Sequence, residues 1–151
     1  MRTAKGFTLI ELLVAVAIIS VLLSVGLVSY SSFQKNARDT QRKRDLDQIK
    51  IALESYFQEN LVYPVDSSGK IKCGATTFNW SERFVCGATP IVYMESLPKD
   101  PKSTSPYIYC YISPAPNSTF RLYASMENDK NENLTAAESC NSVNYKYKIT
   151  N

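Results

Sequence analysis

Residues 7–28 read FTLIELLVAVAIISVLLSVGLV, and this stretch decides how the chain is organised. Its 22 residues carry a single charge, that of Glu11. A bilayer core of about 30 Å is crossed by about 20 apolar residues in a helix, so the stretch is long enough to span a membrane. The six residues before it, MRTAKG, add two positive charges from Arg2 and Lys5. The sequence therefore predicts a membrane-spanning helix near the N-terminus.

Three interpretations of this start compete. A secretory signal peptide has a shorter apolar region of about 7–15 residues before its cleavage site, and the longer run with Glu11 near its beginning argues against it. A plain membrane anchor leaves Glu11 in the headgroup zone, beside the positive end of the helix dipole. The third interpretation gives Glu11 a cationic partner, and residues 7–28 contain no Lys or Arg to supply one.

Nothing forces the helix to end where the apolar run ends. The first proline is Pro64, and Gly26 is the only glycine between Phe7 and Gly69. Beyond residue 45 the pattern is amphipathic, with one face made of Leu46, Ile49, Leu53, Tyr56, Phe57 and Asn60. We predict one helix from about residue 8 to about residue 60, with a membrane-spanning first half and a second half packed on a sheet.

Charged residues dominate the middle of this helix. Residues 35–50 contain six basic and three acidic side chains, and residues 34–45 contain almost no apolar one. We therefore predict a solvated run outside the core of the monomer, with Asp39, Asp45 and Asp47 mostly on the face opposite the apolar stripe. The alternatives are pairing of these charges between subunits, or weak contact with lipid phosphates or DNA.

After residue 63 the composition becomes that of a small β-rich domain. All seven prolines lie here, and alternating runs of β-forming residues occur at 107–112, 119–125 and 145–149. The turn-forming sequence SPAPNS, residues 113–118, predicts a hairpin between the first two runs. One strand face is expected to carry Tyr107, Tyr109 and Tyr111. A long helix covered by a small antiparallel sheet makes the predicted fold class α+β.

The four cysteines, Cys73, Cys86, Cys110 and Cys140, all lie in this β-rich part. Small extracellular domains often add disulfides to a small core, and four cysteines allow three pairings. We favour Cys73 with Cys86, which closes the loop between helix and sheet, and Cys110 with Cys140, which ties the hairpin to the C-terminal segment. A zinc site of four thiolates would lack a CxxC pair, and free buried thiols are a further alternative. Paired cysteines would place this part outside the cytoplasm.

The composition removes most routes to an enzyme. The chain has no histidine, which excludes Ser-His and Cys-His pairs and histidine bases. Its five glycines form neither GxGxxG nor a phosphate-binding loop. The net charge of +3 does not extend to residues 51–151, which hold nine basic and ten acidic residues, a net charge of −1. That part is a poor electrostatic match for nucleic acid, and we expect neither catalysis nor an organic cofactor.

Residues 5–19, KGFTLIELLVAVAII, resemble the N-terminal signature of type IV pilins and type II secretion pseudopilins. The likeness covers a short basic leader that ends in Gly6, then Phe7, then Glu11 within an apolar run. It implies cleavage between Gly6 and Phe7 by a prepilin peptidase on the cytoplasmic face, and N-methylation of the new amine of Phe7. It also implies a homo-oligomeric filament built at an inner-membrane assembly platform. In such filaments the carboxylate matching Glu11 pairs with the N-terminal amine of a neighbouring subunit, which supplies the missing cation.

The resemblance and the charge distribution predict opposite orientations in the membrane. Lysines and arginines gather on the cytoplasmic side of a membrane helix. The leader has two, whereas five follow the apolar run, at positions 35, 38, 42, 43 and 44. We nevertheless expect a cytoplasmic N-terminus, because of the leader and the cysteines. The protein would first be a single-pass membrane protein and then part of an extracellular or periplasmic filament.

A second likeness lies in the β-rich part. The sequence LPKDP, residues 97–101, resembles the LP-x-DP segment that precedes a Tyr-rich strand in major pseudopilins. Some such proteins carry calcium in the loops after this segment. The nearest candidate ligands here are Asp129, Asn131 and Asn133, which alternate as oxygen ligands can. The loop is not an EF-hand, because it lacks the required glycine and glutamate, and a solvated turn is the alternative.

These observations predict four segments: a leader at 1–6, a transmembrane and assembly helix at 7–30, a helical stalk and sheet-packing helix at 31–62, and a disulfide-linked head at 63–151. The predicted function is that of a structural subunit of a type IV pilus or pseudopilus, in secretion, adhesion or motility. The alternative is a minor or competence-type pilin whose head binds DNA, a surface or an exported protein.

Overall fold

The computed structural model describes residues 6–87 and 89–151, and within them the side chains of residues 25–29 lie outside the description. Most of the predicted leader, residues 1–5, is therefore also outside it. The chain divides into two compact units, Met1–Asn36 and Ala37–Asn151. Helix α1, Leu9–Asn60, contributes to both units, so each unit is described by itself below.

The long helix predicted from the sequence is present as α1 and has 52 residues. It ends where Leu61 adopts a positive φ of 59° and donates its N–H to the Phe57 carbonyl, three residues before Pro64. No helix in the described part of the chain is long and apolar enough to cross a membrane.

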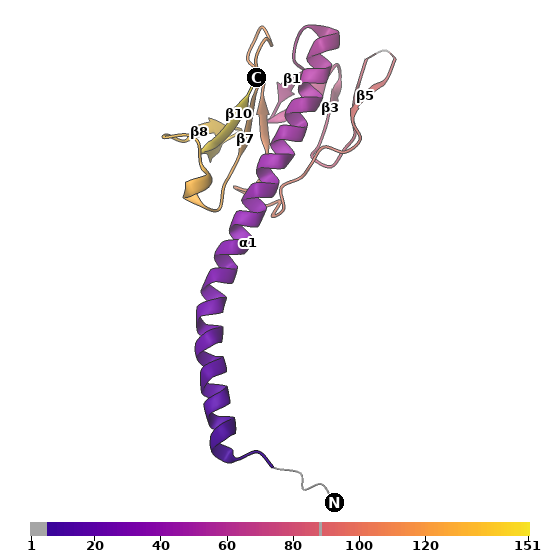
Figure 1. Cartoon of the computed structure of the whole chain (residues 1–151). Coiled ribbons are helices and arrows are strands. Elements are labelled where there is room, and N and C mark those ends of the chain that lie inside the picture. Colours follow the sequence, from indigo (N-terminus) through magenta and orange to yellow (C-terminus); the bar gives the residue numbers. More distant parts are fainter. Residues whose placement is uncertain (1–5, 88) are drawn as a thin grey trace, which may run out of the picture. The chain divides into compact units, whose positions relative to one another are not determined.

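The second unit places short antiparallel strands around the C-terminal part of α1 (Figure 1). One sheet has the order β1–β2–β3 and another the order β10–β7–β6, while β4 pairs with β5 and β8 pairs with β9. The bounds are β1 Val65–Ser67, β2 Lys70–Cys73, β3 Thr76–Thr77, β4 Phe84–Cys86, β5 Ile91–Met94, β6 Cys110–Ile112, β7 Arg121–Ala124, β8 Glu138–Cys140, β9 Val143–Tyr145 and β10 Tyr147–Thr150, with a 3₁₀ turn η1 at Asp129–Asn131. The α+β class is confirmed, with several small sheets in place of one.

The predicted hairpin is confirmed, since β6 pairs antiparallel with β7 and Cys110 lies opposite Tyr123. Two details of the strand prediction are wrong. Strand β6 begins only at Cys110, so Tyr107 and Tyr109 precede it and share no strand face with Tyr111. The run 145–149 is split between β9 and β10, because β9 pairs with β8 whereas β10 pairs with β7.

The turn between β1 and β2 requires a glycine. Its two central residues, Ser68 and Gly69, both have positive φ, 50° and 76°, as a two-residue hairpin turn that follows the twist of its strands demands. A Cβ atom on Gly69 would lie 2.5 Å from the Cys110 Sγ atom. Strand β6 can therefore approach this turn only because residue 69 has no side chain.

The core forms where the apolar stripe of α1 meets the strands. Leu46, Ile49 and Leu53 are fully buried, as their three-and-four spacing predicts. They pack with aromatic side chains from the sheets and loops, among them Tyr63, Phe78, Phe84, Tyr109, Tyr111 and Phe120. Contact between these rings is close, with centroids 4.9 Å apart for Tyr63 and Phe120. The second half of the helix is thus one wall of the core.

Disulfides join Cys73 to Cys86 and Cys110 to Cys140, the pairing favoured above. The first links β2 to β4 across 13 residues, and the second links β6 to β8 across 30 residues. The described part of the chain has no free cysteine. Each bond ties together strands of two different sheets, which limits how far the unfolded chain can expand.

Candidate functional site

Helix α1 begins with three reciprocal hydrogen bonds between Thr8 and Glu11. The Glu11 Oε2 atom accepts the backbone N–H of Thr8 at 2.9 Å and its hydroxyl at 2.7 Å, and the Glu11 N–H donates to the Thr8 Oγ1 atom at 3.3 Å. This arrangement is a capping box, in which two helix-start N–H groups are satisfied by side chains. The hydrogen bonds described for the Glu11 carboxylate both use Oε2, which leaves Oε1 open to another donor.

Exposed apolar side chains lie on both sides of Glu11 in the sequence and cover the whole circumference of this part of the helix. Each of the following is at least 50% exposed: Phe7, Leu9, Ile10, Leu12, Leu13, Val14, Val16, Ile18, Ile19, Val21, Leu22 and Leu23. A shallow hollow lined by Ile10, Val14, Ala15 and Ile18 lies beside Glu11. A helix that is apolar all round is normally covered by other protein or by lipid. This segment therefore offers an uncovered surface with one carboxylate at its start.

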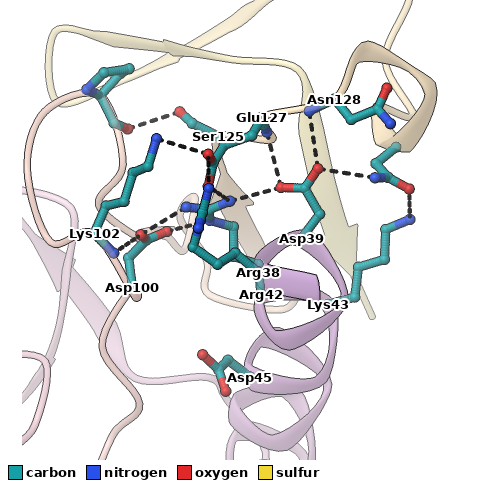
Figure 2. Close-up of polar contacts among 12 residues, drawn as sticks. Arg38, Asp39, Arg42, Lys43, Asp45, Asp100, Lys102, Ser125, Glu127 and Asn128 are labelled. Atoms are coloured by element: carbon teal, nitrogen blue, oxygen red, sulfur yellow. Dashed lines mark hydrogen bonds and ion pairs between the residues drawn. The ribbon is translucent and has the colours of Figure 1, made fainter. Parts of the chain in front are cut away.

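Residues 34–45 were predicted to stay outside the monomer core, and that prediction is wrong. Asp39 and Arg42 are fully buried and Asp45 is 8% exposed. Figure 2 shows Asp39 and Arg42 directed from α1 toward the loops that follow β7 and precede β6. They extend the apolar stripe of the helix toward its N-terminus, so they face the same strands and loops.

Arg42 is at the centre of this ionic cluster. Its Nε and Nη2 atoms donate to the two oxygens of Asp100 at 2.7 and 3.1 Å, and its Nη1 atom donates to Asp39 at 2.7 Å and to Glu127 at 3.0 Å. Burial works against the guanidinium charge, but these carboxylates outweigh it and raise the pKa of Arg42. Because each of the three guanidinium nitrogens donates to a carboxylate, the buried charge is stable where it lies.

Glu127 joins the cluster to two further cations. It binds Arg38 through both oxygens, at 2.6 and 2.7 Å, and its Oε2 atom lies 2.8 Å from the Lys102 Nζ atom. The hydrogen bonds from Arg38 hold the pKa of Glu127 well below its usual range, against the opposing effect of burial. Three cations thus meet the carboxylates of Asp39, Asp100 and Glu127.

Asp39 fixes the loop after β7. Its carboxylate accepts the backbone N–H groups of Glu127 and Asn128 at 2.9 and 3.0 Å, and the side-chain amide of Asn131 at 2.9 Å. The Asn128 side chain in turn accepts the N–H of Lys130 and caps η1. One carboxylate from the helix therefore determines the path of this loop.

Asp45 has a different environment from the other buried carboxylates. Its Oδ2 atom accepts the hydroxyl of Tyr109 at 2.7 Å, and none of the ion pairs in the described residues includes it. Burial raises the pKa of Asp45, while the hydrogen bond from Tyr109 opposes the rise. Desolvation also raises the pKa of Tyr109 strongly, so the hydroxyl stays protonated and continues to donate.

The candidate calcium ligands have protein partners in this structure. The Asn131 Oδ1 atom accepts from the Lys43 Nζ atom at 3.1 Å, and the Asn133 Oδ1 atom accepts the N–H of Lys148 at 2.8 Å, while Asp129 is exposed. Among the described residues no group of three or more acidic, His or Cys side chains is arranged to hold a metal ion. Calcium binding at these residues stays a prediction.

Two features of the site have signals in the sequence. Thr8 and Glu11 form the pattern T-x-x-E ahead of an apolar run, which is the signature of a capping box. Asp39 and Arg42 continue the spacing of Leu46, Ile49 and Leu53 by steps of three and four. Charged residues on an apolar helix stripe indicate buried ion pairs if side chains of opposite charge are available. Here those side chains come from loops that are distant in the sequence.

A comparison with known proteins connects both parts of the chain to one family. The family model of the prokaryotic N-terminal methylation motif matches residues 1–27. The type II secretion system core protein G of Pseudomonas aeruginosa is 30% identical over 129 residues, which cover 82% of this chain and 83% of that protein. The chain belongs to the family of type IV pilins and type II secretion pseudopilins.

Other relatives include both branches of the family. The core protein G of Vibrio cholerae is 28% identical over 82% of this chain and 80% of its own length. The type IV wide pilus major component PilA4 of Thermus thermophilus is 38% identical over 74 residues, 49% of this chain and 56% of that protein. No solved structure matches. Gly6, Phe7, Thr8 and Glu11 all lie within the residues that the methylation-motif model matches.

Proposed function

We propose that the protein is a structural subunit of a type IV pilus or pseudopilus, cut after Gly6 and assembled through the start of α1. The observation that carries the proposal is the exposed carboxylate of Glu11 on a helix whose apolar side chains are uncovered all round. In a filament, the helices of neighbouring subunits cover these apolar side chains in place of lipid. The membership in a family of filament proteins supports this use of the surface.

Before assembly, residues 7–30 are held in the membrane, with the N-terminus in the cytoplasm and residues 63–151 outside it. The support is the run of 22 residues with one charge, part of which lies at positions 25–29, and the disulfides of the head. Reduced thiols are the rule in the cytoplasm, so disulfides fit an exported head. Of the basic residues after the run, Arg38, Arg42 and Lys43 bind carboxylate or amide groups of the head.

Maturation gives each subunit the cation that its neighbour needs. Cleavage between Gly6 and Phe7 by a prepilin peptidase creates an amine at Phe7, which is then N-methylated. Within one chain Glu11 already accepts two bonds from Thr8 at Oε2, so the amine of a second subunit binds at Oε1. Thr8 holds the carboxylate in place, and the charge pair selects the register in which a new subunit docks on the platform.

The chain itself performs no chemistry in this proposal. It lacks histidine, and its buried carboxylates are bound by Arg and Lys or by a tyrosine hydroxyl. The segments are those expected above: leader 1–6, assembly helix 7–30, stalk and packing helix 31–62, and head 63–151. Charged side chains of stalk residues 38–43 bind loops of the head of the same chain. Fewer stalk charges are therefore left to bind neighbouring subunits or DNA.

The test compares Glu11→Gln with Glu11→Ala in cells that assemble the filament. Gln keeps an oxygen that accepts from Thr8 but removes the charge, whereas Ala removes both. We expect both variants to be cleaved after Gly6, as measured by mass spectrometry of the mature N-terminus, and both to yield few or no filaments in electron micrographs. Normal filaments with Glu11→Gln would contradict the charge pair, and a mature N-terminus at Met1 would contradict the proposed function.

A further inference from the structure

Two neighbouring hollows in the second unit share Trp80 in their walls. The first has a volume of about 180 Å³, and its walls include Trp80, Tyr107 and Tyr109. The second has a volume of about 160 Å³ and shares Trp80 and Tyr109 with the first. Lys70 also lines both. The tryptophan side chain thus lines both hollows and is partly exposed, and no part of the filament proposal uses it.

The walls of the first hollow are held by buried contacts. Tyr109 is 2% exposed, its hydroxyl donates to Asp45, and its ring meets that of Trp80 edge-on at a centroid distance of 5.8 Å. The ring of Tyr107 has the Arg42 guanidinium at 4.9 Å and the Lys102 ammonium at 4.3 Å. These aromatic walls belong to the same network as the ionic cluster, so they are in place before any ligand arrives.

The charge of the first hollow is positive. Lys70 and Lys99 lie at its rim, and Asp100 is the carboxylate in its lining. Both Asp100 oxygens are bound by Arg42, which neutralises that charge. The Lys70 ammonium donates to the Asn79 Oδ1 atom at 2.6 Å and keeps two other N–H groups, and Lys99 is exposed. An anionic group entering here meets two ammonium groups, while the Asp100 carboxylate is bound by Arg42 and the nearby Glu82 carboxylate accepts the two N–H groups of Asn79.

We propose that this hollow binds a carboxylated sugar ring, such as one hexuronate unit of an acidic polysaccharide. The C–H face of a sugar ring covers an aromatic side chain such as Trp80, and its hydroxyls suit the polar groups of Asn79 and Ser103 at the wall. The carboxylate pairs with Lys70 and Lys99. A nucleotide would also place a ring on Trp80, but the net charge of −1 over residues 51–151 disfavours a strand of phosphates.

Trp80 is the single tryptophan of the chain, so its fluorescence reports on the hollow directly. The full-length protein in uncharged detergent micelles is titrated with galacturonate, and separately with galactose, with acetate and with a single-stranded oligonucleotide. We expect a saturable change of Trp80 emission with galacturonate, and at the same concentrations none with galactose, which lacks the charge, or with acetate, which lacks the ring. A change with the oligonucleotide alone, or an equal one with galactose, would overturn the proposal.

Variants locate the binding site. Lys99→Gln removes an exposed rim charge and leaves the core untouched, and we expect it to weaken galacturonate binding about two- to fivefold, as loss of one exposed charge pair does. Lys130→Gln is the matched control, since Lys130 is an exposed lysine in the loop after β7 and does not line the hollow. Equal affinity of wild type and Lys99→Gln, or an equal loss in Lys130→Gln, would place the sugar elsewhere and refute the assignment.

Discussion

Arg42 binds both carboxylate oxygens of Asp100, a residue 58 positions later in the chain, and both side chains are completely buried. The pair joins the middle of α1 to the loop before β6, and Asp39 and Glu127 complete the shell around the guanidinium. A buried charge that keeps its partners is tolerated, and one that loses them is costly. The position of the head on its helix therefore depends on this pair.

We predict that Asp100→Asn destabilises the protein by about 3–5 kcal/mol, because it leaves Arg42 buried with part of its partners missing. The measurement is urea unfolding of the full chain in micelles, followed by Trp80 fluorescence. Arg83→Gln is the control, since its pair with Glu95 is exposed and should contribute less than about 1 kcal/mol. Similar losses of unfolding free energy in the two variants would show that the buried pair contributes no more to stability than the exposed one.

Asp45→Asn, unlike Asp100→Asn, should not destabilise the protein. The amide oxygen of Asn still accepts the hydroxyl of Tyr109, and the variant removes a buried charge that has no ion-pair partner among the described residues. We expect the stability at neutral pH to remain within about 1 kcal/mol of wild type, or to rise. Asp45→Leu, which leaves the Tyr109 hydroxyl buried without an acceptor, should lose about 1–3 kcal/mol. A large loss with Asn in the same unfolding assay would contradict this account of Asp45.

The pH dependence of stability should reflect Glu127. Its folded pKa lies below the ordinary value of 4.5, so on acidification the unfolded chain binds the proton first. The stability that Glu127 contributes is thus present above pH 4.5 and is lost as the pH falls through the folded pKa. Asp45, whose pKa is raised, acts with the opposite sign.

We therefore expect the Tm measured by circular dichroism to fall as the pH drops below 4.5. Glu127→Gln should have a lower Tm at neutral pH and a shallower acid slope. An unchanged slope in the variant would mean that other carboxylates cause the acid sensitivity.

Gly69→Ala and Gly74→Ala make a matched pair. Both glycines have positive φ, 76° and 58°, so an alanine at either position is strained by about 1 kcal/mol. A Cβ on Gly69 would also meet the Cys110 Sγ atom, whereas nothing lies within 4 Å of a Cβ on Gly74. We expect Gly69→Ala to lose a further 1–3 kcal/mol or so in thermal unfolding. Equal losses would mean that β6 can move away from the turn.

The sequence by itself determined the features that depend on neighbouring residues. The span of α1 follows from the absence of proline before Pro64, and its core face from the spacing of Leu46, Ile49 and Leu53. The β6–β7 hairpin follows from two alternating runs around a turn sequence. Each of these signals lies within a few residues, so local propensity and periodicity are enough to recognise it.

Only the tertiary structure decided which charges enter the core. Asp39 and Arg42 lie in a stretch whose sequence pattern predicts exposure to solvent. They are buried because Arg42 binds Asp100 and Glu127, which lie 58 and 85 positions later in the chain. The same holds for Tyr109, whose hydroxyl meets Asp45 across 64 positions and whose ring then supports Trp80. A charge or hydroxyl is stable in a core only when its partners are present, and partners so distant in sequence are brought together by the fold alone.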